Sequence, residues 1–187
     1  MNASVKTAVI HLSEETLAKA VGGDQTAFTE LVRQHQRMVF SLAYHFLHDG
    51  TLAEELAQEV FLELYRSLAK IESLSHLKFW LRRVTGHRCI DWARRNNHRP
   101  EISLEGLPEP AALAPPGDPI LAQRLRRLVA ALPAKPRLIV TMRFQEDLQP
   151  SEIAEILEMP INTVKSQLYR GLELLHQKLS ALEKLPV

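Results

Sequence analysis

Four side chains near the C-terminal end of the sequence have the chemistry needed to contact nucleic acid. Lys165, Ser166, Tyr169 and Arg170 are close together in the chain, and in an α-helix their spacing places them on one side. Lysine and arginine bind phosphate oxygens, while arginine, serine and tyrosine can also donate hydrogen bonds to base edges. The segment could therefore contact both the backbone and the bases of DNA.

Two helical patterns position these side chains. The first begins at Pro150, since proline is favoured at the first position of a helix, and it ends before Pro160, because proline disfavours helical geometry in the preceding residue. The second follows Asn162, a favourable N-cap. One apolar stripe is predicted along it, made by Val164, Leu168, Leu172, Leu175 and Leu179. The two patterns are typical of a helix-turn-helix, whose second helix enters the major groove of DNA. The alternative is an ordinary helical hairpin with a solvated polar face, because this pattern has many false matches.

A second group of cations lies in the middle of the chain. Between His76 and Pro100, seven lysines and arginines stand against Asp91 alone. Phe79, Trp80 and Trp92 are interleaved with them, and single-stranded nucleic acid favours such a mixture of cations and stacking surfaces. The alternative is that both tryptophans are core residues. We expect this for Trp92, which lies on the apolar stripe.

The segment before the cations is acidic. From Asp49 to Glu72 there are six acids against Arg66 and Lys70, and an acidic helix beside a basic one indicates two different partners. Glutamates clustered on one helix could instead suggest a magnesium-dependent nucleotide pyrophosphohydrolase. That chemistry needs acids from two helices, and the sequence contains no second acidic helix. The eight histidines show no metal-ligand spacing. We therefore expect no enzymatic activity, no metal site and no cofactor.

Cysteine content and hydropathy predict a cytoplasmic protein. Cys89 is the single cysteine of the 187 residues, which excludes internal disulfides and suits a reducing compartment. No apolar run approaches the ~20 residues needed to span a bilayer, and the apolar run near the N-terminus is too short for a signal peptide. We therefore expect no membrane insertion.

The periodicity predicts an all-α fold of two small helical domains. Residues 1–12 are expected to form a flexible tail and residues 13–99 the first domain. Six of the 11 prolines fall between Pro100 and Pro119, and this density favours an extended linker at residues 100–118. Residues 119–187 are expected to form the second domain, with four helices, of which the last two form the helix-turn-helix.

Local signals set the helix limits in the first domain. Ser13 and Asp24 are N-cap candidates. The residues from Thr51 to Glu54 have the spacing of a capping box. A loop is expected from Lys70 to Ser75, and the basic helix is expected to begin at His76.

Four parts of the chain resemble bacterial RNA polymerase sigma factors of the extracytoplasmic function (ECF) type. GDQTAFTEL at residues 23–31 is similar to the family's G-D-x-x-A-F-x-x-L, and AEELAQEVF at residues 53–61 is similar to its A-E-D-L-x-Q-E-V-F. FWLRRV at 79–84 with DWARR at 91–95 resembles its W-L-x-R-I-A...D-Y-x-R-R helix. EIAEIL at 152–157 and TVKSQLYRG at 163–171 resemble its E-I-A-x-I-L and T-V-K-S-R-L-x-R-A. The short linker leaves no room for the middle domain of larger sigma factors.

The resemblance implies a function, partners and site residues. A sigma factor binds core RNA polymerase, recognises the −35 and −10 promoter elements, assists DNA melting and usually has an anti-sigma partner. The acidic helix would bind the helical clamp of the largest polymerase subunit through Glu55, Gln58 and Glu59. The −35 element would be read by Lys165, Ser166, Tyr169 and Arg170, with Arg137 on a phosphate. The −10 element would be held by the loop and the basic helix through Ser73, Ser75, His76, Trp80, Arg82, Arg83, His87, Arg94 and Arg95. Of these, Ser73, Ser75 and His76 would line a pocket for an unstacked base.

The chain departs from the family pattern in the turn of the helix-turn-helix and in the basic helix. Glu158 stands where the turn of the helix-turn-helix usually has a glycine, and Arg88 stands where the basic helix usually has an apolar residue. A repressor or activator with a similar helix-turn-helix is the nearest rival in the DNA-binding class. It would leave the acidic and basic helices of the first domain without a role.

Overall fold

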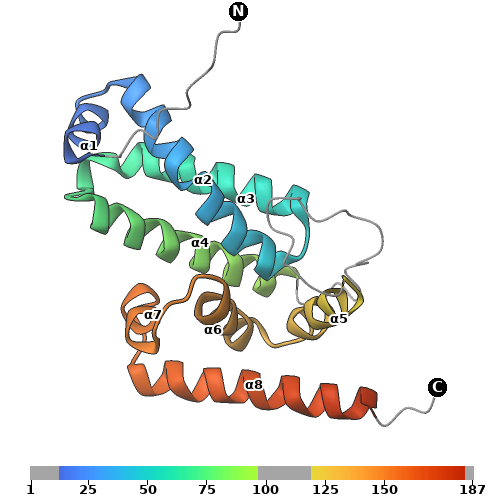
Figure 1. Ribbon diagram of the computed structural model, residues 1–187. Helices are drawn as coiled ribbons and strands as arrows, with labels where there is room; N and C mark the ends of the chain where they lie inside the picture. The colour runs from blue at the N-terminus through green and yellow to red at the C-terminus, as the bar shows by residue number, and fades with distance from the viewer. Residues whose placement is uncertain (1–12, 97–118, 184–187) are drawn as a thin grey trace, which may run out of the picture.

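A computed structural model describes residues 13–96 and 119–183 (Figure 1). Within these ranges the chain is all-α, with eight α-helices and one short 3-10 helix and no strand, which confirms the predicted fold class. The predicted tail at 1–12 and linker at 100–118 lie outside the described residues. None of the described helices combines the length and apolar character that crossing a membrane requires.

The first domain consists of α1 (Glu14–Val21), α2 (Gln25–Leu47), α3 (Gly50–Ser67), the 3-10 turn η1 (Leu68–Lys70) and α4 (Leu74–Asn96). Ser13 and Asp24 cap α1 and α2 as predicted, because their side chains accept hydrogen bonds from the first-turn N–H groups of Thr16 and Thr26. The helices meet over fully buried side chains: Leu31, Leu42, Phe46, Leu64, Leu77 and Leu81.

Two predicted helix starts in this domain are wrong. Helix α3 is capped by Asp49, whose carboxylate accepts from Leu52 N–H at 3.0 Å, and not by a capping box from Thr51. His48 ends α2 in the left-handed region with φ 56°, and this turn brings Asp49 to the cap position. Helix α4 begins at Leu74, two residues earlier than predicted, because the Ser73 hydroxyl accepts from His76 N–H at 3.1 Å.

The second domain consists of α5 (Pro119–Ala130), α6 (Ala134–Gln145), α7 (Pro150–Ile156) and α8 (Ile161–Glu183), the four helices predicted. Pro150 begins α7, where Gln149 N–H donates to the Glu152 carboxylate at 2.7 Å. Helix α8 begins at Ile161, so Asn162 lies inside its first turn and is not the N-cap. The turn between them uses a left-handed residue, Glu158 with φ 50°, at the position where the family usually has glycine.

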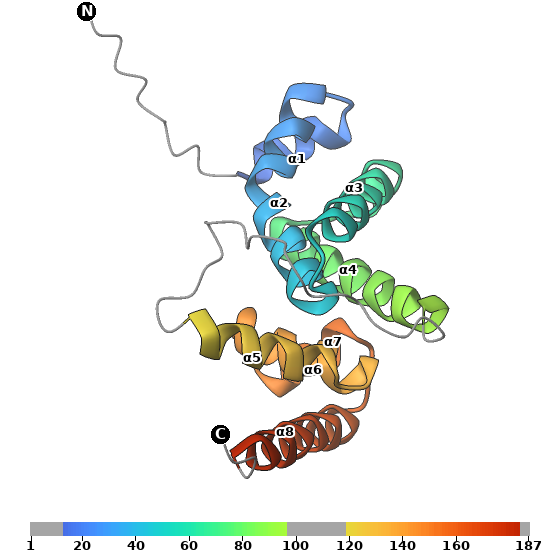
Figure 2. The same ribbon diagram turned by 90° about the vertical axis from the view of Figure 1, so that its right-hand side faces the viewer.

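Helix α4 is the central element of the molecule. It packs on α2 and α3 on one side and on α6 and α7 on the other (Figures 1 and 2). One apolar cluster runs without a break from Leu17 of α1 to Val164 of α8. Gly86 of α4 lies where the two domains meet, and a Cβ there would be 3.1–3.3 Å from side-chain atoms of Met142, Leu138 and Leu157. The two domains are therefore closely packed against each other.

A second close approach joins α8 to α6 and gives a stability prediction. A Cβ on Gly171 would lie 2.9 Å from Val140 Cγ2 and 3.3 Å from Pro136 Cβ. Because Val140 and Pro136 are short, buried side chains, a Gly171→Val substitution should overpack this contact and lower the free energy of unfolding by about 1–3 kcal/mol in urea titrations. Gly50→Ala is the control, since nothing lies within 4 Å of that position, and it should change stability by less than about 0.5 kcal/mol. An unchanged midpoint for Gly171→Val would contradict the close α6–α8 packing.

Candidate functional site

The polar face predicted on the second helix of the helix-turn-helix is present in α8. Lys165, Ser166, Tyr169 and Arg170 are all exposed, and Tyr169 is 72% exposed. Val164 anchors the opposite face with no exposed surface. The Ser166 hydroxyl donates to the carbonyl of Thr163 at 2.9 Å, so its oxygen can still accept a hydrogen bond. The structure therefore presents these four side chains together to solvent.

Arg137 does not join this face. Its guanidinium donates to the carbonyl of Leu132 at 2.9 and 3.2 Å and to the carbonyl of Phe46, in the first domain, at 3.4 Å. Its Cζ is 5.0 Å from the centroid of the Phe46 ring. Burial lowers the pKa of Arg137. The predicted −35 phosphate contact of Arg137 does not agree with this placement, because the side chain serves as a contact between the domains.

The basic helix α4 presents its cations in two groups. His87, Arg94 and Arg95 are exposed, and Arg94 pairs with Asp91 of the same helix at 3.2 Å. Arg82 and Arg83 are half-buried and pair with acids of the second domain: Arg82 with Glu146 at 3.0 Å and Arg83 with Glu158 at 2.7 Å. In this conformation the second group is therefore already neutralised.

The three side chains predicted to line a base pocket lie together at the start of α4. The Ser73 and Ser75 hydroxyls are 3.0 Å apart, and Glu72 N–H donates to His76 Nδ1 at 3.3 Å. Trp80 and Trp92 are both half-buried against the apolar cluster that joins the two domains, and for Trp92 this agrees with the expected position on the apolar side. The cluster is held from outside by Glu14 of α1, whose carboxylate accepts from Leu74 N–H at 3.1 Å.

The acidic helix α3 exposes Glu55, Gln58 and Glu59, as the proposed polymerase contact requires. It also supplies the partners of Arg88, which pairs with Glu59 at 3.2 Å and with Glu63 at 2.7 Å. Some charged side chains of the acidic and basic helices are therefore paired with each other, and only the other charged side chains are available to partners. Across the described residues, no three His, Cys, Asp or Glu side chains are arranged to hold a metal ion.

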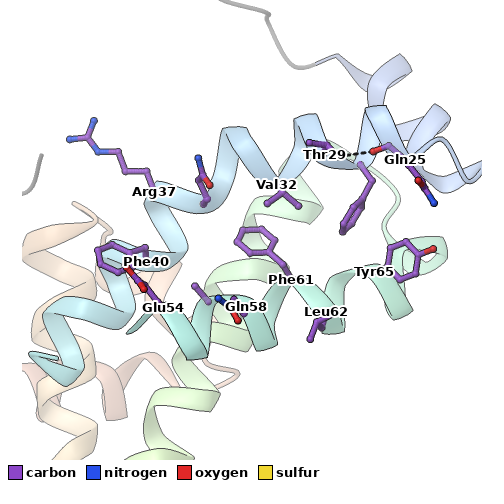
Figure 3. Close-up of a pocket in the computed structure, with 13 residues that line it drawn as sticks. Gln25, Thr29, Val32, Arg37, Phe40, Glu54, Gln58, Phe61, Leu62 and Tyr65 are labelled. Atoms are coloured by element: carbon purple, nitrogen blue, oxygen red, sulfur yellow. Dashed lines mark hydrogen bonds between the residues drawn. The ribbon is translucent and has the colours of Figure 1, made fainter. Parts of the chain in front are cut away.

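An apolar groove between α2 and α3 was not predicted from the sequence. It has a volume of about 1020 Å³ and is lined mainly by apolar and aromatic side chains, with Arg37, Glu54 and Gln58 among its polar members. Figure 3 shows Val32 and Phe40 of α2 facing Phe61 and Tyr65 of α3 across it. Leu62 is 58% exposed at its edge. Its apolar lining and charged edge suit an amphipathic helix of a partner protein.

Two family models match the two domains in order. Sigma-70 region 2 matches residues 31–99, and Sigma-70, region 4 matches residues 122–175. The chain is also 29% identical over 179 residues to the ECF RNA polymerase sigma factor SigW of Bacillus subtilis, covering 86% of this chain and 92% of that protein. It is 29% identical over 185 residues to the ECF RNA polymerase sigma-E factor of Escherichia coli K12, covering 91% of this chain and 96% of that protein. The chain belongs to the ECF sigma factor family. This ECF sigma factor is a promoter-recognising transcription initiation factor, and sigma factors are not enzymes.

The fold of this sigma factor agrees with the assignment. It is similar to the sigma factor RpoE of Bartonella quintana, solved in complex with the anti-sigma factor NepR, with a TM-score of 0.63 and 21% identity. The match covers 82% of this chain and 96% of that one. The predicted family is thus confirmed by both domains and by their order.

Proposed function

We propose that this sigma factor binds core RNA polymerase through α2 and α3, holds the melted −10 element with the start of α4 and its arginines, and reads the −35 element with α8. Residues 13–99 would form the domain for polymerase and the −10 element, residues 119–187 the −35 domain, and residues 100–118 the linker that spans the polymerase between them.

The observation that carries the proposal is the exposed face of α8. Four side chains able to bind phosphate and base edges stand on one side of a helix whose other side is fixed in the core by Val164. A recognition helix needs this arrangement, because its base contacts come from the first turns and its orientation comes from the packing behind them. Four such side chains make a small contact, so most of the affinity for promoter DNA would come from tethering to polymerase.

The polymerase surface that we propose combines the apolar groove with the acidic side chains beside it. Glu54 and Gln58 line the groove together with Leu62, and Glu55 is exposed beside them on α3. An apolar groove provides affinity, while the acids at its rim select a basic partner and speed association. The helical clamp of the largest subunit, implied by the family resemblance, would occupy it.

The −10 surface that we propose is the start of α4 with the cations that follow it. Ser73, Ser75 and His76 lie within one turn and present hydroxyl and imidazole groups to an unstacked base. His87, Arg94 and Arg95 are exposed along the helix and would hold phosphates. Arg82 and Arg83 would join them once released from their acids.

We also propose an anti-sigma factor as a third partner and the cytoplasm as the location. The first is supported by the capture of a sigma factor of similar fold with an anti-sigma factor. The cytoplasmic location is supported by the family assignment, because a sigma factor acts on RNA polymerase. It also agrees with Cys89, which is a free and buried cysteine.

Run-off transcription with purified core polymerase tests the proposal. The wild-type protein should bind core and direct initiation from promoters that the holoenzyme selects out of a random duplex library. A protein that neither binds core nor directs initiation would end the proposal.

A double variant, Lys165→Ala with Arg170→Ala, tests the −35 contact in the same holoenzyme. Its affinity for a selected promoter should fall at least about tenfold, and the slope of log affinity against log salt should become shallower by about 0.9 for each lost phosphate contact. The control is His176→Ala with Gln177→Ala, two exposed positions in the C-terminal half of α8. Unchanged affinity and salt slope in the Lys165/Arg170 variant would place the −35 contact elsewhere.

A further inference from the structure

A second cavity, with a volume of about 660 Å³, lies on the other side of α2 from the apolar groove, beside α4 and the end of α6 (Figure 1). Met38 is the single apolar residue in its lining. The polar and charged members include His35, Ser41 and His45 of α2, Lys78 and Arg82 of α4, and Glu146 after α6. Small-molecule sites have volumes in this range. The cavity can therefore hold a small polar ligand.

The lining of this cavity is positively charged. Arg37 of α2 and Lys78 and Arg82 of α4 face a single carboxylate in the lining, that of Glu146. Lys78 is exposed, and it makes no hydrogen bond or ion pair with another described residue. A cleft lined by an excess of one charge concentrates ligands of the opposite charge. The ligand that suits this cavity is therefore an anion.

Arg82 keeps hydrogen-bonding capacity for such an anion. Its Nε and Nη2 both donate to one oxygen of Glu146, Oε2, at 3.2 and 3.0 Å. Within the described part of the chain, its Nη1 has no hydrogen-bond partner. Because a guanidinium has five N–H donors in one plane, Arg82 can hold Glu146 and bind a second acceptor at the same time.

The two cations of α4 act on the same part of the cavity. Burial, followed by the charges of Lys78 and Arg82, lowers the pKa of His35 on the α2 wall. The same two cations act on the carboxyl of Glu146, where they oppose the rise in pKa that burial causes. The positive charges of Lys78 and Arg82 therefore converge between α2 and the end of α6.

We propose that this cavity binds a small anion with two or more phosphate groups, held by Lys78 and Arg82 on one wall and by Arg37 on the other. Lysine binds phosphate as a point charge, and arginine binds it through parallel N–H groups. The cavity is larger than one phosphate group and has cations on both walls. A ligand with more than one phosphate can contact both walls at once.

The phosphates could belong to a free ligand or to a DNA strand, and the lining favours a free ligand. It contains no Phe, Tyr or Trp side chain, whereas proteins that bind single strands provide aromatic surfaces on which bases stack. The Glu146 carboxylate beside Arg82 would also repel the further phosphates of a continuous backbone. A compact anion can place its phosphates on the cations and avoid this acid.

Calorimetric titration of the full chain with inorganic pyrophosphate, at constant ionic strength and without divalent cations, tests the proposal. Wild type should bind one pyrophosphate per chain with a Kd below about 1 mM. Sulfate, which has a single anionic group, should bind at least about tenfold more weakly. Lys78→Ala should raise the Kd for pyrophosphate at least about tenfold, because it removes a charge-assisted contact.

Matched variants separate a site in the cavity from a general effect of charge. Lys70→Ala removes the same charge from an exposed position outside the lining and should leave the Kd unchanged. Glu146→Gln neutralises the acid of the lining and should tighten pyrophosphate binding at least about threefold. Glu155→Gln, at an exposed position of α7, should have no effect. The gain expected for Glu146→Gln cannot come from a variant that fails to fold.

A fluorescent single-stranded oligonucleotide of mixed sequence distinguishes the two sources of phosphate. Lys78→Ala should change its affinity by less than about threefold, because a long strand loses at most one of many phosphate contacts. The proposal is overturned if wild type shows no saturable pyrophosphate binding or if Lys78→Ala and Lys70→Ala behave alike. It is also overturned if Lys78→Ala weakens binding of the oligonucleotide and not of pyrophosphate. Run-off transcription tests the proposed function separately, since neither result depends on the other.

Discussion

A Leu62→Arg variant should bind core RNA polymerase about 30- to 1000-fold more weakly than wild type, which corresponds to about 2–4 kcal/mol. Leu62 is 58% exposed at the edge of the groove between α2 and α3, so arginine should not disturb the free protein. In the complex the same position would be covered by an apolar partner helix, and a buried cation without an acid beside it is costly. Affinity for core, measured by titration with labelled protein, should therefore fall while the urea midpoint stays constant.

The matched control for this prediction is Val21→Arg. Val21 is 43% exposed at the end of α1, in the same domain but outside the groove lining. The Val21→Arg substitution adds the same charge at a similarly exposed apolar position and should leave the affinity for core polymerase unchanged. If Leu62→Arg binds core as wild type does, the groove is not the polymerase surface. Equal losses in both variants would indicate an effect of added charge alone.

Glu59→Arg is a less direct test of the same surface. Glu59 is exposed, yet it pairs with Arg88 of α4 at 3.2 Å, so reversing its charge places two arginines side by side between α3 and α4. A loss of core binding could then come from a displaced helix. Glu55→Arg avoids this problem, because the described residues include no hydrogen bond or ion pair to Glu55.

The sequence contains the apolar residues that line the groove, but it does not show that they form a groove. The core stripe of α3 runs through Leu56, Val60 and Leu64, and Phe61, Leu62 and Tyr65 lie off that stripe. Apolar residues outside the buried stripe are a signal for a binding surface. The opposing wall comes from α2, more than 20 residues earlier in the chain, so only the packing of the two helices reveals a groove. The sequence indicated the acidic rim and not the apolar surface between the helices.

Local signals in the sequence predicted most helices. The features that they did not predict depend on contacts between distant parts of the chain. Caps at Ser13 and Asp24 and the proline at position 150 act within one turn, so residue types reveal them directly. The cap of α3 depends on the left-handed turn at His48, and histidine is not a residue type that predicts such a turn. The roles of Arg82 and Arg137 depend on Glu146 and Phe46, which are 64 and 91 residues away, respectively. The sequence therefore predicts that all cations of the basic helix are available to DNA, whereas in the structure some of them are paired with acids of other helices and turns.

Within residues 13–96 and 119–183, His48 is a buried polar residue with both ring nitrogens unpaired. It is 9% exposed, and neither ring nitrogen has a hydrogen-bond partner among the described residues. Burial, followed by the charge of Arg137, lowers the pKa of His48 from 6.5 to about 4. His45 and Arg126 also lower the pKa of His48, and no carboxylate of the described residues raises it. Burial in the first domain and the charge of Arg137 from the second domain therefore both favour the neutral form of His48.

Acid should destabilise the protein through this residue. The unfolded chain takes up a proton on His48 near pH 6.5, while the folded protein does so only near pH 4. The stabilisation linked to the neutral ring is thus complete above pH 6.5 and is lost as the pH falls from 6.5 to 4. Because a tenfold difference in proton affinity is worth about 1.4 kcal/mol, the loss between pH 7.5 and 4.5 should be about 2–3 kcal/mol.

The measurement that isolates His48 is the difference in unfolding free energy between wild type and His48→Asn, taken from urea titrations at several pH values. Asparagine tolerates the left-handed backbone at this position better than other residues do, so helix α2 should still end there. His35 and Glu146, whose pKa values are also shifted by burial, remain in both proteins, so their contributions cancel in the difference. Wild type should lose its advantage over the variant as the pH falls, with most of the change between pH 6.5 and 4.5. A difference that does not vary with pH would mean that the His48 ring takes up a proton as readily in the folded protein as in the unfolded chain, and it would contradict the unpaired burial of the ring.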